Sequence, residues 1–235
     1  MSDTLFFCPD IATLPQLPLQ ESQHCVKVLR MREGDALTVT DGQGFFYECV
    51  LTEAHPKHCI VRIENRTEMV KKRDFVLHIG FAPTKQMERN EWFVEKAVEI
   101  GIDRFTPLLS SYSERKEMKE ERLEKIAISA TKQSQQAFLP VIDELTRFSD
   151  FVTRPFEGRK FIAHCHDLPK KRLAQTYRKK ENALILIGPE GDFSEEEVGM
   201  AVANGFEPVS LGETRLRTET ACLVAAHTIH VLNNQ

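Results

Sequence analysis

The sequence predicts an α/β domain with a mainly parallel sheet, preceded by a small β-barrel-like domain. After residue 74, segments of strand and helix character alternate, which is typical of parallel sheets. One of them, residues 183–187 (ALILI), is fully apolar, as expected of a central strand buried on both faces. The first 70 residues contain short strands and glycine turns instead, a pattern typical of small barrels. We therefore expect two domains, residues 1–73 and 74–235.

The N-terminal domain is predicted from short strand segments around one tight turn. Residues 36–40 (ALTVT) alternate, the string DGQG at 41–44 supplies turn residues, and a strand resumes at Phe45. The polar stretch 64–74 is expected to be the linker between the domains. The predicted strands cover residues 5–7, 36–40, 45–52 and 59–63, and one short helix is expected at 24–31.

The C-terminal domain is predicted from apolar helix faces and from signals at helix ends. Phe93, Ala97 and Ile100 share one face of a helix that Gly101 ends. A further helix begins with a capping box, the string SEEE at 194–197. The expected strands are 75–81, 102–109, 160–163, 183–187 and 208–211, and the expected helices are 85–100, 119–138, 194–203 and 218–232.

The composition is that of a globular protein and leaves nucleic-acid binding open. The net charge is −4, and phosphate binding needs positive charge, which a local patch supplies whatever the total. The six cysteines form no C-x-x-C pair and are expected to be reduced, small apolar residues. No apolar run approaches the roughly 20 residues that span a bilayer, and the first ten residues lack secretory features, so a cytoplasmic location without membrane contact is expected.

Two loops follow predicted strands and precede helices, where open α/β sheets bind their ligands. The first is IGPEGDF at 187–193 and the second is LGETRLR at 211–217. Glycines allow close approach of the backbone to a ligand. Neither loop has the lysine of a P-loop or the G-x-G-x-x-G of a dinucleotide site, and Glu190 and Asp192 would repel phosphate but tolerate a cationic sulfonium. The alternative is that both loops are only tight strand–helix turns.

Five segments, in order along nearly the whole chain, carry a resemblance to a known family. The strings IGPEGDFSEEE at 187–197 and LGETRLRTETA at 211–221 are the most specific. The others are HCVKVLRMREGD at 24–35, Lys85 with KAVEIG at 96–101, and KQSQQAFLP at 132–140. Together they resemble the RsmE family of 16S ribosomal RNA uridine N3-methyltransferases, of the SPOUT superfamily. The family often has arginine where this chain has Gln135 and Gln136, and a basic start where this chain has Ser2, Asp3 and Thr4.

The resemblance implies both a fold and an activity. It implies a PUA-like β-barrel followed by a SPOUT domain whose C-terminal part forms a deep trefoil knot, a feature otherwise nearly absent from proteins. It also implies a homodimer and an enzyme that uses S-adenosylmethionine to methylate N3 of a uridine in 16S rRNA, either free or in the small ribosomal subunit. The alternatives are a SPOUT methyltransferase acting on another rRNA or tRNA base, and a non-catalytic RNA-binding module.

The resemblance also implies roles for particular residues. Arg217 is expected to stabilise the uracil oxyanion or orient the base, unless it forms a structural pair with Glu190 or Glu219. Glu190 is a weaker candidate for the general base, because an acid in such a turn often only accepts backbone N–H groups. The residues expected to bind the cofactor are Ile187, Gly188, Gly191, Leu211, Gly212, Leu216 and Arg217.

RNA contacts are expected from clustered basic residues, since phosphate contacts position the nucleic acid. The candidates are Lys27, Arg30, Arg32 and Lys85, with Lys71, Lys72 and Arg73 beside the linker. A solvated charged surface is the plain alternative for each.

No metal site is expected. The string HCH at 164–166 is the one candidate, but neighbouring residues on a strand point to opposite faces and no further ligand cluster is evident. Trp92 is interpreted as a packing residue.

Overall fold

The computed structural model describes residues 4–71 and 73–234, which form two compact units. The N-terminal unit comprises the described residues up to 71 together with Ile128–Leu139, and the C-terminal unit comprises Arg73–Ala127 and the described residues from Pro140 onward. The expected division, 1–73 and 74–235, differs from this chiefly at Ile128–Leu139, which the sequence assigned to the second domain.

Hydrogen bonds explain why that segment belongs to the N-terminal unit. The Gly44 N–H donates to the Ala137 carbonyl over 2.9 Å, and the Leu139 N–H donates to the Gly42 carbonyl over 2.8 Å. The backbone of this late segment therefore completes the hydrogen bonding of the turn at 41–44, a pairing across about 95 residues that no local pattern signals.

The N-terminal unit is built on a four-stranded sheet in the order β1-β2-β3-β4. Strand β1 runs parallel to β2, and the other neighbours are antiparallel. A buried cluster that includes Phe6, Tyr47 and Leu51 forms its core. The elements are β1 (Leu5–Phe7), α1 (Leu19–Gln23), the π-helix η1 (His24–Val28), β2 (Ala36–Thr40), β3 (Phe45–Glu53) and β4 (Ile60–Glu68).

Two predictions for this unit were wrong in extent. The short helix begins at Leu19 rather than at 24, and it continues as a π-helix that ends at Val28. Strand β4 continues to Glu68, through residues assigned to the linker, because antiparallel pairing with β3 extends to Phe45↔Glu68. Cross-strand hydrogen bonds stabilise this polar sequence in an extended conformation although its own pattern is not strand-like.

The C-terminal unit contains an eight-stranded sheet whose pairings are all parallel. The strand order is β10-β12-β9-β11-β5-β6-β7, and β8 pairs with β6. Its strands are β5 (Leu77–Phe81), β6 (Arg104–Leu109), β7 (Val141–Ile142), β8 (Thr146–Arg147), β9 (Arg159–Ala163), β10 (Lys171–Arg172), β11 (Ala183–Ile187) and β12 (Glu207–Ser210). All five residues of β11 are buried, which confirms the prediction of a central strand.

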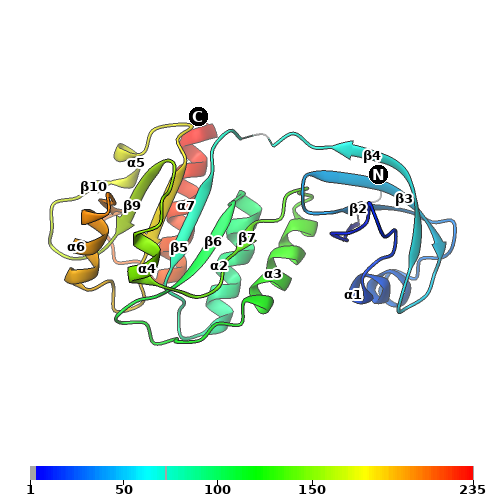
Figure 1. Cartoon of the computed structure of the whole chain (residues 1–235), viewed down its shortest axis with the longest axis horizontal. Helices are drawn as coiled ribbons and strands as arrows, with labels where there is room; N and C mark the ends of the chain where they lie inside the picture. Colours follow the sequence, from blue (N-terminus) through cyan, green and yellow to red (C-terminus); the bar gives the residue numbers. More distant parts are fainter. Residues whose placement is uncertain (1–3, 72, 235) are drawn as a thin grey trace. The chain divides into compact units, whose positions relative to one another are not determined.

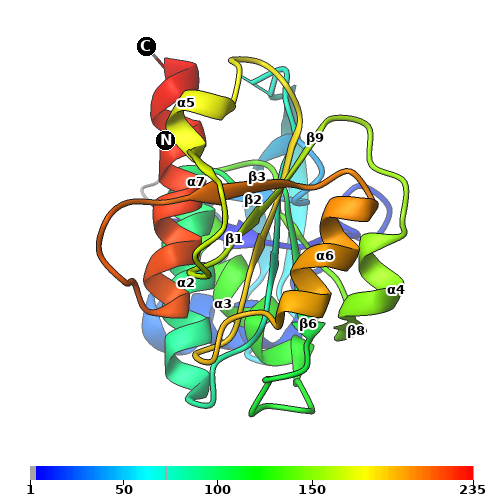
Figure 2. The same cartoon turned by 90° about the vertical axis from the view of Figure 1, so that its left-hand side faces the viewer.

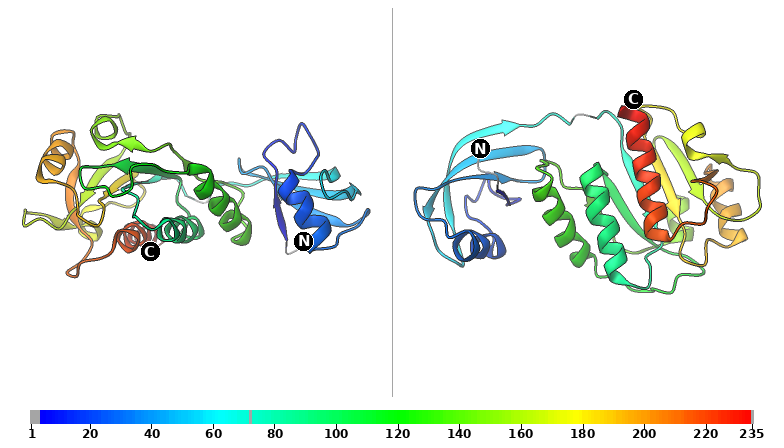
Figure 3. Two further views of the ribbon diagram at one scale, coloured as in Figure 1. Left: turned by 90° about the horizontal axis from the view of Figure 1, so that it is seen from below. Right: turned by 180° about the vertical axis from the view of Figure 1, so that it is seen from behind.

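Helices cover both faces of this sheet. Figure 2 shows α2 and α7 on one face and α4 and α6 on the other, and Figure 3 shows α2 and α7 side by side from behind. Phe148, Leu186 and Phe193 belong to the apolar core under α4 and α6. The helices that follow β5 in the chain, visible in Figure 1, are α2 (Met87–Ile100), α3 (Glu120–Gln133), α4 (Phe148–Val152), α5 (Leu173–Thr176), α6 (Glu195–Ala203) and α7 (Thr218–Asn234).

The predicted helix-end signals of this unit are present. Gly101 ends α2 in the left-handed conformation, with φ of 100°. Ser194 and Glu197 form the predicted capping box at the start of α6, in which each side chain bonds to the backbone of the other residue. The fold is thus the predicted α/β class with a mainly parallel sheet and a smaller β unit, while the trefoil knot stays a prediction.

Candidate functional site

A pocket of about 660 Å³ lies in the C-terminal unit, at the carboxyl ends of three neighbouring strands. Strand β9 lies between β11 and β12 in the sheet, so the loops that follow these three strands meet at one edge. This is where open α/β sheets bind ligands, and the volume falls within the range of about 300–1,000 Å³ that is typical of small-molecule sites.

The first loop, which follows β11, is held in one conformation by backbone geometry. A Cβ at Gly188 would lie 2.9 Å from the Phe193 nitrogen, so the turn closes on itself only with glycine at this position. The Thr218 hydroxyl, from the start of α7, donates to the Gly188 carbonyl over 3.1 Å. Asp192 has φ of 69°, a conformation that aspartate adopts more readily than most residues.

A third loop, which follows β9, contributes to the pocket and was not identified by sequence reasoning as a ligand site. Its Cys165 N–H donates to Asp192 Oδ2 over 2.6 Å, and His166 Nε2 lies 2.6 Å from the Phe193 carbonyl oxygen. Asp192 therefore joins the β9 loop to the β11 loop. The signal available in the sequence was the HCH string after a strand, but only the strand order places that loop beside the others.

The second predicted loop, which follows β12, contains a glycine that the fold itself does not require. A Cβ at Gly212 would meet no heavy atom within 4 Å among the residues described, and its φ is not in the left-handed region. Glycine is usually found where a turn, a tight contact or a ligand demands it. Gly212 lies on the pocket wall, where the absence of a side chain leaves room for a ligand to approach the backbone closely.

His164 provides a second sign that this region is completed by something besides the protein. It is 6% exposed and lies on the pocket wall, and both ring nitrogens are buried without a hydrogen-bond partner among the described residues. Buried polar groups are almost always paired in native proteins. Burial, together with the positive charge of Lys170, lowers the pKa of His164, which favours the neutral imidazole.

The charged residues of the first two loops make few contacts with each other. The Lys85 N–H donates to Glu190 Oε1 over 3.3 Å, and Arg215 Nη2 donates to the Glu190 carbonyl over 3.3 Å. Within the described part of the chain, the exposed Arg217 side chain has neither an ion-pair nor a hydrogen-bond partner. Glu219, one of its expected structural partners, lies 3.7 Å from Arg89 Nε instead.

The pocket brings together most of the predicted site residues. Its wall includes Ile187, Gly188, Glu190, Leu211, Gly212, Leu216 and Arg217. Gly191 differs, because it lies outside this wall and faces Tyr112: a Cβ on Gly191 would be 3.1 Å from the Tyr112 Cβ. Its glycine is thus explained by packing of the loop tip against a neighbouring loop.

The predicted RNA-binding residues lie on the surfaces of both units. In the N-terminal unit Lys27, Arg30 and Arg32 are exposed, and Arg30 has the left-handed φ of 57°. In the C-terminal unit the exposed Lys85 pairs with Glu114 at 3.0 Å.

The basic residues beside the linker differ from one another. Lys71 is exposed, whereas Arg73 pairs with Asp103 at 3.2 Å and is only 22% exposed in its side chain. The Arg73 guanidinium is therefore already paired with a carboxylate of the C-terminal unit. Lys72, like Ser2 and Asp3, lies outside the described residues.

Residues 4–71 and 73–234 contain neither a metal-site cluster nor a helix able to span a membrane. The rings of His164 and His166 lie 5.6 Å apart, and no cluster of three or more histidine, cysteine or acidic residues there has the arrangement of a metal site. No helix in these residues has the length and apolar character needed to span a bilayer.

The match to known families follows the division of the fold. A model described as an RNA methyltransferase domain matches residues 71–230, and a model described as an RNA methyltransferase PUA domain matches residues 18–64. The parallel sheet with its pocket, and the small β unit, therefore define an RNA methyltransferase.

Comparison with individual relatives identifies the family within the RNA methyltransferases. A ribosomal RNA small subunit methyltransferase E from Buchnera aphidicola subsp. Acyrthosiphon pisum is 30% identical over 216 residues, which are 87% of this chain and 83% of the relative. The chain belongs to this family, RsmE.

Solved structures agree with the sequence comparison. A probable rRNA-methyltransferase from Porphyromonas gingivalis is 44% identical, with a TM-score of 0.93 and coverage of 98% of both chains. A ribosomal RNA small subunit methyltransferase E from Neisseria gonorrhoeae, solved bound to S-adenosyl methionine, is 25% identical, with a TM-score of 0.86 and coverage of 98% of both chains.

The pocket fits the same ligand chemistry. The open space beside Gly212 and the unpaired nitrogens of His164 suit a ligand with hydrogen-bonding groups, and Glu190 and Asp192 on the wall suit its positive charge. S-adenosylmethionine has both properties and is the methyl donor of this family.

Proposed function

We propose that this protein transfers the methyl group of S-adenosylmethionine to N3 of a uridine in the 16S rRNA of the small ribosomal subunit, which implies a cytoplasmic location. The proposal is carried by the pocket at the ends of β9, β11 and β12, where the glycine at 212 leaves room for a ligand to approach the backbone closely. The relative from Neisseria gonorrhoeae, with the same fold, binds S-adenosyl methionine.

The chemistry sets what the site must provide. A bond forms between N3 and the methyl carbon while the carbon–sulfur bond breaks, and the N3 proton leaves to a base. The neutral, protonated N3 is a poor nucleophile, so negative charge must develop on the uracil ring and spread to its carbonyl oxygens. Donors positioned where this charge develops lower the barrier most, and alignment of the two reactants contributes up to about 7–11 kcal/mol.

Arg217 is the residue we assign to the developing oxyanion. It lies on the pocket wall at the start of α7, and its guanidinium has no ion-pair or hydrogen-bond partner among the described residues, so it is free to bind an anionic ring. Glu190 is the weaker candidate for the base, because its Oε1 already accepts the Lys85 N–H. That contact agrees with a structural role for this carboxylate.

The donor would be held largely by backbone groups of the β11 and β12 loops. The residues that we assign to it are Ile187, Gly188, Leu211, Gly212 and Leu216, with Arg217 beside them. Calorimetry with S-adenosylmethionine tests this assignment, and absence of binding would favour a non-catalytic RNA-binding module.

Removal of the Arg217 guanidinium gives the sharpest test of the mechanism. We predict that Arg217→Ala lowers the methylation rate by about 10²–10³-fold, as when an oxyanion donor is removed, while donor affinity changes far less. Arg217→Lys keeps the positive charge but loses the planar guanidinium, so its methylation rate should lie between those of the wild type and Arg217→Ala. A rate for Arg217→Ala within about threefold of the wild-type rate, which is under 1 kcal/mol, would exclude this role.

RNA binding is assigned to Lys27, Arg30 and Arg32 in the N-terminal unit and to Lys85 in the C-terminal unit, all of them exposed. Each phosphate contact adds about 0.7–0.9 to the slope of log affinity against log salt concentration. Replacing Lys27, Arg30 and Arg32 by glutamine should flatten that slope, and an unchanged slope would exclude these contacts.

The identity of the substrate is testable directly. Ribosomal RNA and small subunits from a strain that lacks this protein are methylated in vitro, and the product is mapped by mass spectrometry. Methylation at N3 of one uridine in 16S rRNA is the expected result, and a product at another rRNA or tRNA base would select the alternative within the superfamily. We also propose a homodimer, for which the expected result in analytical ultracentrifugation is about twice the 26.9 kDa chain mass.

A further inference from the structure

Tyr112 is a large aromatic residue on the surface of the C-terminal unit that the apolar core does not use. It lies in the loop after β6 and is 55% exposed. Its hydroxyl has no hydrogen-bond partner among the described residues. A single exposed aromatic needs no explanation by itself, but the surroundings of Tyr112 are unusual in three respects.

The loop that carries Tyr112 is fixed on both sides of it. The Ser110 and Ser113 hydroxyls lie 2.9 Å apart, and the Ser111 N–H donates to Glu197 Oε1 over 2.8 Å. After Tyr112, Arg115 Nε donates to the Thr84 carbonyl over 3.1 Å. These bonds hold the backbone at Tyr112, so little backbone entropy remains to be lost when a ligand stacks on its ring.

Tyr112 also contacts the donor loop. A Cβ added at Gly191 would lie 3.1 Å from the Tyr112 Cβ and 3.6 Å from its Cγ. The tip of the loop that contributes Gly188 and Glu190 to the pocket wall is therefore the surface on which Tyr112 rests. Tyr112 therefore lies beside the segment that would hold the methyl donor.

The loops next to Tyr112 carry three basic residues, Lys85, Arg115 and Arg215, together with the acidic Glu114 and Glu190. The Lys85 side chain is 77% exposed, and its Nζ forms an ion pair with Glu114 at 3.0 Å. Arg115 is fixed to the backbone at Thr84, and Arg215 is fixed to the Glu190 carbonyl. An exposed aromatic ring among cations is the combination that binds unpaired nucleic acid, in which bases stack on the ring and phosphates contact the cations.

We propose that Tyr112 is a positioning residue for the RNA substrate, on which one unpaired base stacks next to the methyl-donor pocket. The inference rests on the proposed function and adds a residue to it. Enzymes that modify bases need the target out of the helix, and a stacking surface at the pocket would hold either the displaced base or its neighbour. Any base has a face that can stack, so Tyr112 contributes position rather than sequence selectivity.

The kinetic test compares three variants. Tyr112→Leu should lower kcat/KM for rRNA methylation by about 5- to 100-fold, the range that base stacking spans, with donor affinity unchanged. Tyr112→Phe should retain wild-type kcat/KM, because the ring and not the hydroxyl stacks. Trp92→Leu is the matched control, since Trp92 on α2 is also a partly exposed aromatic, at 42%, and should leave kcat/KM unchanged. Wild-type kcat/KM in Tyr112→Leu overturns the inference.

A fluorescence measurement detects stacking without turnover. The chain has one tryptophan, so the double variant Trp92→Phe, Tyr112→Trp carries a single reporter at the proposed position. Addition of a single-stranded RNA copy of the mapped target segment should quench this reporter, and the Trp92 signal of the wild-type protein should not respond. An unquenched reporter despite RNA binding overturns the inference.

Three outcomes distinguish the stacking role of Tyr112 from the proposed function and from a contact between two copies of the chain. If the wild-type protein methylates rRNA and Tyr112→Leu does so equally well, the stacking role fails while the proposed function stands. If the wild-type protein does not methylate rRNA, the proposed function itself fails. A change in sedimentation for Tyr112→Leu would assign the ring to contact with a second copy of the chain and overturn the stacking role.

Discussion

The two ends of the parallel sheet in the C-terminal unit differ in how their polar groups are paired. At the carboxyl end lie a glycine with open space around it, a buried histidine with both nitrogens unpaired and an arginine without a partner among the described residues. At the amino end, charged side chains bond to one another and to the backbone. The comparison separates the part of the sheet built for a ligand from the part built for stability.

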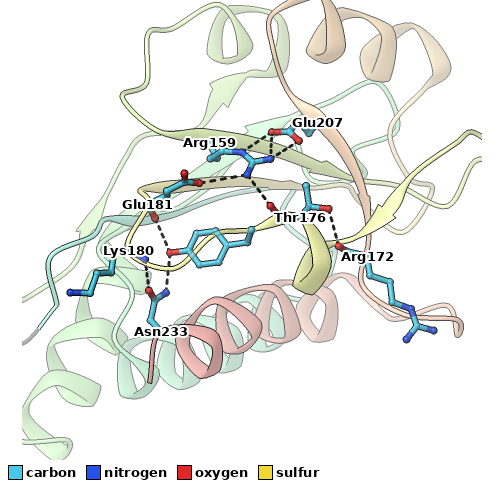
Figure 4. A network of polar contacts seen from close by, with 8 residues as sticks. Arg159, Arg172, Thr176, Lys180, Glu181, Glu207 and Asn233 are labelled. Atoms are coloured by element: carbon cyan, nitrogen blue, oxygen red, sulfur yellow. Dashed lines mark hydrogen bonds and ion pairs between the residues drawn. The ribbon is translucent and has the colours of Figure 1, made fainter. Parts of the chain in front are cut away.

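Two networks make up the amino end. Figure 4 shows Arg159 between Glu207 and Glu181 and close to Thr176. Arg159 Nε donates to Glu207 Oε1 over 2.8 Å and Nη1 donates to the Thr176 carbonyl over 2.8 Å, which connects the first residues of β9 and β12 with α5. The same figure shows Asn233, which is near the end of α7, beside Lys180. The Lys180 backbone N–H donates to Asn233 Oδ1 over 2.7 Å.

The second network connects residues of β5 and β6 with Asp143, which follows β7. Arg104 binds Asp143 through two nitrogens, at 2.8 and 2.7 Å, and the Thr106 hydroxyl donates to the same carboxylate. His78 Nε2 lies 2.7 Å from the Thr106 oxygen. The Arg104 guanidinium and the Thr106 hydroxyl hold the pKa of Asp143 below its usual value despite its burial. Every one of these side chains has its partner within the protein.

The largest effect is expected from a side chain added at the open glycine. Gly212→Val should weaken donor binding by about 10³-fold, about 4 kcal/mol, because it fills the space assigned to the ligand. The melting temperature should stay at the wild-type value, since a Cβ there meets no atom within 4 Å in the described structure. Calorimetry measures the donor affinity and thermal unfolding measures the melting temperature. An unchanged donor affinity would exclude the assignment of Gly212 to the donor site.

The opposite behaviour is expected from a glycine at the amino end. Gly158 has φ of 148°, and a Cβ there would lie 2.5 Å from the Asn182 side chain and carbonyl. Gly158→Ala should therefore lower the free energy of unfolding by about 3 kcal/mol, from steric overlap and backbone strain together. Donor affinity of the folded protein should not change. Chemical denaturation measures the free energy of unfolding, and a decrease of less than about 1 kcal/mol for Gly158→Ala would contradict the prediction.

The His78 network predicts sensitivity to acid. Burial lowers the pKa of His78 to about 4, against 6.5 in the unfolded chain. Between these values the unfolded chain binds a proton that the native protein does not, so the free energy of unfolding falls as pH decreases from 6.5 to 4, by up to about 3 kcal/mol. Above pH 6.5 the imidazole is neutral in both states and contributes no pH dependence.

His78→Gln tests this origin of the acid sensitivity. The glutamine amide can still bond to the Thr106 hydroxyl but does not titrate, so the free energy of unfolding should change less between pH 6.5 and 4. Urea denaturation at a series of pH values between 4 and 6.5 measures the slope for both proteins. Equal slopes in wild type and His78→Gln would assign the acid sensitivity to other groups.

The smallest effect is expected at Arg159. Arg159→Met keeps the length of the side chain but removes its bonds to Glu207 and Thr176, and should lower the free energy of unfolding by about 1–2 kcal/mol. The value is modest because Glu207 is 44% exposed in its side chain and water replaces part of the interaction. Urea denaturation measures the change, and donor affinity at the other end of the sheet should stay constant.

The sequence was sufficient for features that depend on near neighbours in the chain. Residues 183–187 identified the central strand because five apolar residues in a row suit burial on both faces. Ser194 and Glu197 identified the start of α6, since a capping box needs only residues three apart. The two loops proposed to hold the methyl donor were selected from their own residues, and most of those residues line one pocket.

Other features depend on pairings between distant segments, and the tertiary structure decided them. The grouping of residues 128–139 with the N-terminal unit was not predicted, because their hydrogen-bond partners lie near residue 42. The loop after β9 and His164 were missed as part of the pocket because nothing local states that β9 lies between β11 and β12. The approach of Gly191 to Tyr112 was not predicted, because Tyr112 lies almost 80 positions earlier in the sequence. Local preferences act over a few residues, whereas a binding site is made where the sheet brings remote strand ends together.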